Sequence, residues 1–280
     1  MTPSSAAEGV VPPPPARPTS ADIRPFEHVI VPFDNSADAQ RAAVVGSDLA
    51  DLLHTDLVLA TMGDSSLQPG SRTKRRAQSL SDDAATIWVE PGRSVVAALS
   101  TMTRYRPQSL ICLATHARTG VLRAVYGNLA EQLLRDLEVP VLLLGPRCRE
   151  PKVAAIGHIV VCVDHSPASV TAVSLAASWA RHQAVNATIA YAQARDEIAA
   201  DINELILPLE QRCAIVKKVS FPRDAYLDGV LDIVTHSTSS LIVVAAHMTS
   251  GLGRLHHDRL VTELSLRSPV PVLVRRAAEG

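Results

Sequence analysis

The sequence contains two copies of one pattern, and this duplication limits the fold more than any other feature of the chain. The segment Ser109 to His116 reads SLICLATH, and the segment Ser240 to His247 reads SLIVVAAH. A separation of 131 residues relates the two histidines that end these segments, and the same separation relates Pro140 to Pro271. Self-similarity at one fixed separation predicts two structurally equivalent units.

Each copy opens with a buried strand that ends in an aspartate. The run HVIVPFD ends at Asp34, and the run HIVVCVD ends at Asp164, 130 residues later. Continuous apolar runs of this length are typical of strands that are covered on both faces. A helix start follows each aspartate, with Ser36 as the predicted N-cap in the first copy and Ser166, before Pro167, in the second.

Strand and helix patterns alternate through both copies. Such alternation predicts a parallel sheet with right-handed crossover helices on both faces. We therefore predict an α/β protein with two doubly wound five-stranded parallel-sheet domains in tandem. The predicted strands are 29–33, 57–62, 86–89, 110–114 and 141–144 in the first copy, and 159–163, 188–192, 215–219, 241–245 and 272–274 in the second.

The 280 residues are enough for two domains that each bury a core. We expect a disordered, proline-rich arm over 1–25, a first domain over 26–147, a linker over 148–156 and a second domain over 157–276. No apolar run approaches the length of a membrane-spanning helix or a signal-peptide core. The expected location is the cytoplasm, with no membrane partner.

Charge and cysteine usage argue against several classes of function. The formal net charge of −1 offers no field that would attract nucleic acid. The basic run RTKRR at 72–76 is short and lacks interleaved aromatic residues, so we interpret it as the polar face of a helix. The four cysteines show no CxxC pair and are expected to be buried, reduced thiols.

The residues quoted above resemble the universal stress protein domain in both copies, from about Phe26 to Arg276. This resemblance implies the adenine nucleotide alpha hydrolase-like fold and a stress-response regulator without dedicated catalysis. It implies ATP or another adenine nucleotide as the ligand, with magnesium as its companion ion. The family holds phosphates with the pattern Gly-x2-Gly-x9-Gly-Ser/Thr after the fourth strand, where glycines let backbone N–H groups approach an anion.

The first copy keeps part of that pattern. Ala114 and Ala117 replace the first two glycines, Gly127 is retained, and Asn128 stands where serine or threonine belongs. Alanine is the smallest replacement, so the resemblance places nucleotide binding in this copy. The implied contacts come from Pro32, Phe33, Asp34, Met62, Ala114, Ala117, Gly127, Asn128 and Leu129.

The second copy departs further from the family pattern. Ala245 and Met248 take the first glycine positions, and Asp258 with Arg259 replaces the final pair. A carboxylate at the phosphate position repels a polyphosphate unless a cation neutralises it. We expect this second site, with Asp164, Ala245, Met248 and Arg259, to bind nucleotide poorly or not at all.

Several alternatives stay open. Asp34 and Asp164 can bind a ribose or a base amine, and they can equally serve the start of the following helix. His116, His247 and the pair His256–His257 lack the spacing of a metal site, so no metal is expected. Two competing functions remain. One is a nucleotide-free module that binds a regulated protein partner, and the other is a weak ATPase.

The family also implies pairing through the last strand of each copy, here 139–144 and 270–274. Two copies in one chain can satisfy each other as an intrachain pseudo-dimer, which removes two exposed sheet edges. A further homodimer of two chains is left open by the sequence.

Overall fold

The computed structural model describes residues 26–34, 36–62, 85–89, 94–115, 128–149, 153–164, 166, 168–193, 199–237, 239–246 and 254–277. Several sequence predictions lie outside these residues: the arm 1–25, the basic run 72–76, His116, Ala117, Gly127, His247 and Met248.

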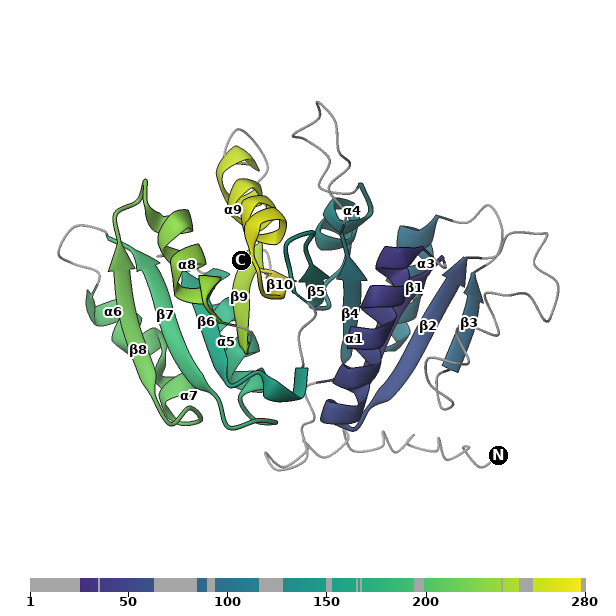
Figure 1. Cartoon of the computed structure of the whole chain (residues 1–280), viewed down its shortest axis with the longest axis horizontal. Helices are drawn as coiled ribbons and strands as arrows, with labels where there is room; N and C mark the ends of the chain where they lie inside the picture. The colour runs from purple at the N-terminus through teal and green to yellow at the C-terminus, as the bar shows by residue number, and fades with distance from the viewer. Residues whose placement is uncertain are drawn as a thin grey trace, which may run out of the picture.

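The described chain forms one ten-stranded sheet with the order β3-β2-β1-β4-β5-β10-β9-β6-β7-β8. Figure 1 shows the two halves side by side, with β5 and β10 at the centre. The first half comprises β1 (His28–Phe33), α1 (Ala37–Leu53), β2 (Asp56–Met62), β3 (Ala85–Val89), α3 (Val95–Tyr105), β4 (Ser109–Ala114), α4 (Asn128–Asp136) and β5 (Val141–Leu144). The second half comprises η1 (Val153–Ala155), β6 (His158–Val163), α5 (Ala168–Trp179), β7 (Asn186–Ala192), α6 (Ala199–Leu205), α7 (Leu207–Glu210), β8 (Val216–Phe221), α8 (Tyr226–Thr235), β9 (Ser240–Ala246), α9 (Arg254–Arg267) and β10 (Val272–Arg276).

Strand pairing within each half is parallel, and pairing between the halves is antiparallel. β1 pairs with β2 and β4, and β6 pairs with β7 and β9, all in parallel. β5 and β10 meet in the register Val272 to Leu143 and Val274 to Val141. The predicted fold class and the predicted pairing of the last strands are therefore confirmed.

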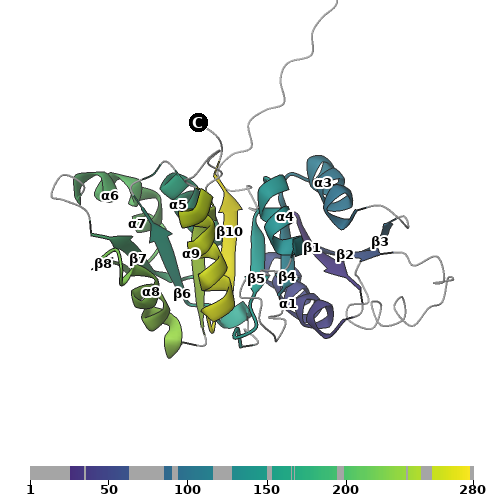
Figure 2. The same ribbon diagram turned by 90° about the horizontal axis from the view of Figure 1, so that it is seen from above.

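Two hydrophobic cores cover the two faces of this sheet, and each core runs through both halves. Alternate strand residues such as Val29 and Ile30 enter opposite cores. α1 and α5 cover one face, whereas α3, α4, α8 and α9 cover the other. Because the sheet is twisted, α1 and α5 appear on different sides of the molecule in Figure 2.

The segment that connects the halves packs into the core on the face covered by α1 and α5. Cys148, Val153 and Ile156 are buried, and η1 contacts α1. The Arg41 guanidinium of α1 donates hydrogen bonds to the carbonyls of Gly145 and Cys148, at 2.8 and 2.9 Å. Residues expected to form a linker thus include core positions, because the second half begins directly beneath α1. All four cysteines are free and buried, as predicted.

The histidines that open β1 and β6 have different surroundings. His28 Nδ1 lies 3.6 Å from the Asp56 carboxylate. The His158 ring nitrogens lie 2.9 Å from the hydroxyls of Ser240 and of Thr188. Burial, with a smaller contribution from Lys217, lowers the pKa of His158.

This environment predicts that stability falls at mildly acidic pH. The unfolded chain protonates His158 near its ordinary pKa of about 6.5, whereas the folded chain resists protonation. Stability is therefore full above that pH and declines as the pH falls below it. Thermal unfolding measured from neutral to mildly acidic pH should show that Tm falls less for His158→Gln than for the parent chain. His236→Gln, at an exposed histidine after α8, should decline like the parent; equal declines in both variants would contradict the prediction.

Candidate functional site

Each half places a crevice at the carboxyl ends of its central strands. The chain builds β2 and β3 on one side of β1 and then crosses to β4 on the other side. Such a reversal of strand order opens a ligand site outside the strand ends. The same reversal recurs at β6, which lies between β7 and β9.

The first-half crevice brings together five of the residues that the sequence singled out. Pro32, Phe33, Asp34, Ala114 and Leu129 line a cavity of about 160 Å³. Met62 is the last residue of β2 and Asn128 the first of α4, so both backbones lie at that end of the fold. Ala117 and Gly127, which complete the predicted phosphate contacts, lie outside the described residues.

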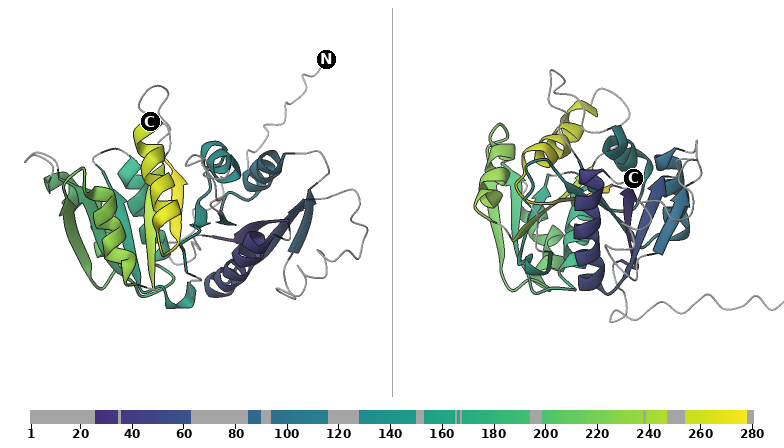
Figure 3. Two further views of the ribbon diagram at one scale, coloured as in Figure 1. Left: turned by 45° about the horizontal axis from the view of Figure 1, so that its top comes forward. Right: turned by 45° about the vertical axis from the view of Figure 1, so that its right-hand side comes forward.

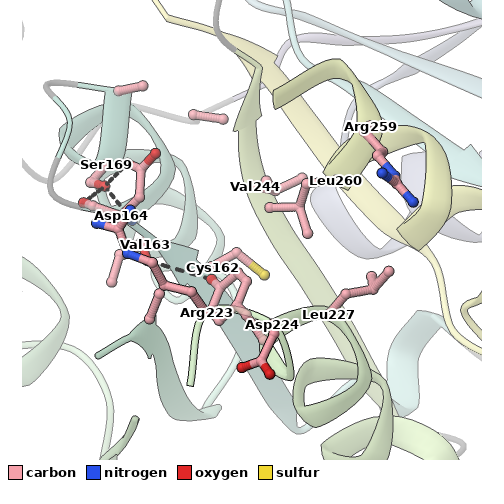
Figure 4. A pocket seen from close by; sticks show the side chains of 14 residues that line it. Cys162, Val163, Asp164, Ser169, Arg223, Asp224, Leu227, Val244, Arg259 and Leu260 are labelled. Carbon is pink, nitrogen blue, oxygen red and sulfur yellow. Dashed lines mark hydrogen bonds between the residues drawn. The ribbon is translucent and has the colours of Figure 1, made fainter. Parts of the chain in front are cut away.

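The second-half crevice is much larger, with a volume of about 690 Å³. Asp164, Ala245 and Arg259 line it, as the sequence placed them, and Met248 lies outside the described residues. Figure 4 shows Asp164 and Ser169 on one side of this cavity and Val244 and Leu260 on the opposite side. The other lining residues are Cys162, Val163, Ala168, Ala192, Arg223, Asp224, Tyr226 and Leu227.

The aspartates at the two strand ends differ in how firmly the fold holds them. The Asp34 carboxylate is exposed and accepts the Ser36 backbone N–H at 3.0 Å. The Asp164 carboxylate accepts the corresponding N–H of Ser166 at 3.1 Å and also the hydroxyl of Ser166. Both side chains therefore stabilise the turn before the next helix, which is the structural role that the sequence left open.

Ser169, in the first turn of α5, adds a further anchor in the second half alone. Its hydroxyl lies 2.9 Å from the Asp164 carboxylate and accepts the Asp164 backbone N–H at 2.9 Å. The corresponding residue of the first half, 130 positions earlier, is Ala39, which has no side-chain hydrogen-bonding group. The fold therefore orients Asp164 more strongly than Asp34.

Two residues that line the larger cavity, Tyr226 and Cys162, here called its floor, are neutral. Tyr226 donates its hydroxyl to the Ala190 carbonyl at 3.0 Å, and its ring packs edge-on against Phe221. Burial raises the pKa of Tyr226 well above its ordinary value. Burial also raises the pKa of the adjacent Cys162 thiol to about 12. Both groups stay protonated near neutral pH, so the floor offers neither an anion nor a thiolate nucleophile.

The described residues contain no group of three histidine, cysteine or acidic side chains that could hold a metal ion. Nor does that part of the chain include a helix long and apolar enough to cross a membrane.

Known proteins resemble this chain in structure rather than in sequence. No protein-family model matches the sequence, and no curated protein matches it. A universal stress protein structure from Archaeoglobus fulgidus superposes with a TM-score of 0.64 at 14% identity, over 90% of this chain and 99% of that one. A protein of unknown function from Pseudomonas aeruginosa gives a TM-score of 0.57 at 15% identity, over 90% and 93% of the two chains.

The chain has the tandem universal stress protein fold. The similarity spans both halves, which agrees with the duplication in the sequence. In this fold several of the lining residues that the sequence did not indicate belong to helices or helix starts beside the crevice. Ala168, Ser169, Tyr226, Leu227 and Leu260 are on helices, and Arg223 and Asp224 precede α8.

Of these residues, Ser169 could have been found by comparing the two universal stress protein-like repeats. Ser169 differs from its counterpart Ala39 although the strand-end aspartate before it occurs in both copies, so comparing the copies position by position marks it. Arg223 and Asp224 follow β8 and carry no comparable motif. Their place in the crevice depends on how α8 packs against the sheet.

Proposed function

We propose that this chain binds an adenine nucleotide or nucleoside in its second-half cavity and acts in a stress response through binding, without chemistry of its own. The observation that carries the proposal is the cavity of about 690 Å³ at a strand-order reversal, with Asp164 already anchored at its edge. The sequence favoured nucleotide binding in the first half, and binding there stays a prediction. The cavity volumes favour the second.

Size is the first reason for this choice. Small-molecule sites commonly occupy roughly 300 to 1,000 Å³. The second-half cavity of about 690 Å³ falls within that range, whereas the first-half cavity of about 160 Å³ falls below it. A nucleotide would therefore need rearrangement in the first half and little in the second.

The lining supplies recognition groups of the right kinds. The Asp164 carboxylate can accept hydrogen bonds from ribose hydroxyls or a base amine, and Ser166 and Ser169 hold it in place beforehand. Apolar side chains, among them Val244 and Leu260, can cover the faces of a base. These features support a nucleoside moiety as the recognised part.

The phosphate end of the site favours a ligand with few phosphates. Arg223 and Arg259 add positive charge to the cavity wall, while Asp224 adds a negative charge. Asp258 stands beside Arg259 in the sequence, at the position where the family pattern has its final glycine. We therefore propose tighter binding of adenosine or its monophosphate than of ATP.

Isothermal titration of adenosine, AMP and ATP with magnesium tests the proposal. The parent chain should bind about one nucleoside or monophosphate per chain. Asp164→Asn should weaken binding about tenfold, because a hydrogen bond to a charged group contributes roughly 1.5 kcal/mol and tenfold corresponds to about 1.4 kcal/mol. The matched variant Asp34→Asn should bind like the parent.

Two results would overturn this function. Heat in none of the titrations would favour a nucleotide-free interaction module, which the small first-half cavity and the replaced glycines of both copies already support. Phosphate release from ATP and magnesium that Asp164→Asn abolishes would favour a weak ATPase.

A further inference from the structure

A groove lined by arginines lies on the first half of the chain, and none of its lining residues lines either crevice. It runs between α3 and α4 and reaches the end of β10, so its walls come from both halves of the chain. Figures 2 and 3 show α3 and α4 side by side, and α4 also contacts β10. We call it the arginine groove, after Arg104, Arg135, Arg275 and Arg276.

The arginine groove consists of two adjoining hollows of about 490 and 340 Å³, which share Ser100, Arg104 and Asp136. Arg276 donates to the Arg135 carbonyl at 2.6 Å, which fixes the end of β10 against α4. The Arg135 guanidinium pairs with Glu131 at 3.0 Å. Among the described residues no ion pair is found for Arg104, Arg275 or Arg276, so the charges of these three guanidinium groups are not neutralised by a salt bridge, although one Arg276 nitrogen is held by the Arg135 carbonyl.

The duplicated chain shows that the fold does not require these arginines. The positions that correspond to Arg104 and Arg135, 131 residues later, are Thr235 and Leu266. The positions that correspond to Arg275 and Arg276, 131 residues earlier, are Leu144 and Gly145. The four arginines therefore gather at one of two equivalent places, where the other copy builds the same elements without them.

The surroundings of the groove match a protein partner better than a nucleic acid. Tyr105, next to Arg104 at the end of α3, is 84% exposed. Exposed tyrosine beside arginine is typical of protein-binding surfaces. Asp136 and Glu138 also line the groove and would repel a continuous polyphosphate backbone. A chain with spaced carboxylates can reach the arginines and avoid these two acids.

We propose that the arginine groove binds an acidic segment of a partner protein. Carboxylates of that segment pair with the guanidinium groups of Arg104, Arg275 and Arg276, and an apolar or aromatic side chain of the segment packs on Tyr105. Because β10 supplies two of the arginines, the site exists only when the two halves pair through β5 and β10.

Fluorescence anisotropy with a short labelled peptide of alternating glutamate and glycine tests this inference on the full chain. The parent should show saturable binding that weakens with added salt, and the same peptide with glutamine in place of glutamate should show none. The double variant Arg104→Glu/Arg275→Glu should bind at least about tenfold more weakly, because two attractive pairs become repulsive.

A matched double variant separates a local effect from a change in net charge. Arg181→Glu/Arg212→Glu makes the same charge change after α5 and α7, away from the groove, and should bind like the parent. Thermal unfolding of both double variants should match the parent. Peptide binding that survives Arg104→Glu/Arg275→Glu, or its absence in the parent, would overturn the proposal. Tighter binding of a single-stranded oligodeoxynucleotide, lost in the same variant, would replace the acidic peptide with nucleic acid.

Discussion

Gly145→Ala is expected to destabilise the chain by about 3 kcal/mol or more, because it inserts a carbon atom where the end of β5 meets α9 of the second half. Gly145 is buried directly after β5. A Cβ at this position would lie 1.7 Å from the Ser265 carbonyl oxygen of α9, which is backbone and cannot rotate aside. The Gly145 carbonyl is in turn held by Arg41, so neither side has freedom to retreat.

Thermal unfolding gives the measurement for this variant. A loss of this size corresponds to a decrease in Tm of roughly 6 to 12 °C for chains of a comparable size. Gly157→Ala is the matched control, because a Cβ at Gly157 would meet no atom within 4 Å. Its stability should stay within about 0.5 kcal/mol of the parent. An unchanged Tm for Gly145→Ala would mean that α9 does not lie against the end of β5.

Ala245→Phe is expected to abolish ligand binding in the second half, with an affinity loss of at least about 100-fold, equivalent to about 2.7 kcal/mol. Ala245 is the penultimate residue of β9 and lines the larger cavity, so a phenyl ring at this position occupies the space proposed for the nucleoside. The cavity of about 690 Å³ can accommodate the ring, so Tm should change little.

The equivalent substitution in the first half, Ala114→Phe, should have the opposite consequences. Its cavity of about 160 Å³ is too small for a phenyl ring without displacing neighbours, so stability should fall by about 1 to 3 kcal/mol. Nucleoside affinity should remain that of the parent. Titration and thermal unfolding of the two variants would contradict the proposal if Ala114→Phe lost the ligand and Ala245→Phe kept it.

The elements of the fold were predictable because their signals are local. Each first-half strand begins within one residue of its predicted start, and β5 has its predicted bounds. Ser36 accepts the Ala39 N–H as an N-cap should. Boundaries in the second half differ by up to two residues. β7, for example, begins at Asn186 rather than at the predicted residue 188, because parallel pairing with β6 extends it to the register of His158.

The candidate site was only partly predictable. The sequence located both strand-end aspartates and the alanines Ala114 and Ala245 at the carboxyl ends of β4 and β9, because those residues lie in repeated motifs. It did not indicate that Ser169 anchors Asp164, nor that Tyr226 closes the cavity floor with its hydroxyl on Ala190. These contacts join residues whose spacing follows no motif.

The duplication and the alternation of strands and helices along the chain were therefore determined by the sequence alone, since buried strands, helix caps and a fixed repeat leave few arrangements. The family resemblance added pairing through the last strands, and the structure showed that this pairing is antiparallel. Only the tertiary structure decided which crevice is large and which residues are in contact where the two halves pair. The reason is that cavity volume and close backbone approach depend on small displacements of packed helices. Two copies of one pattern can thus enclose about 160 Å³ in one half and about 690 Å³ in the other.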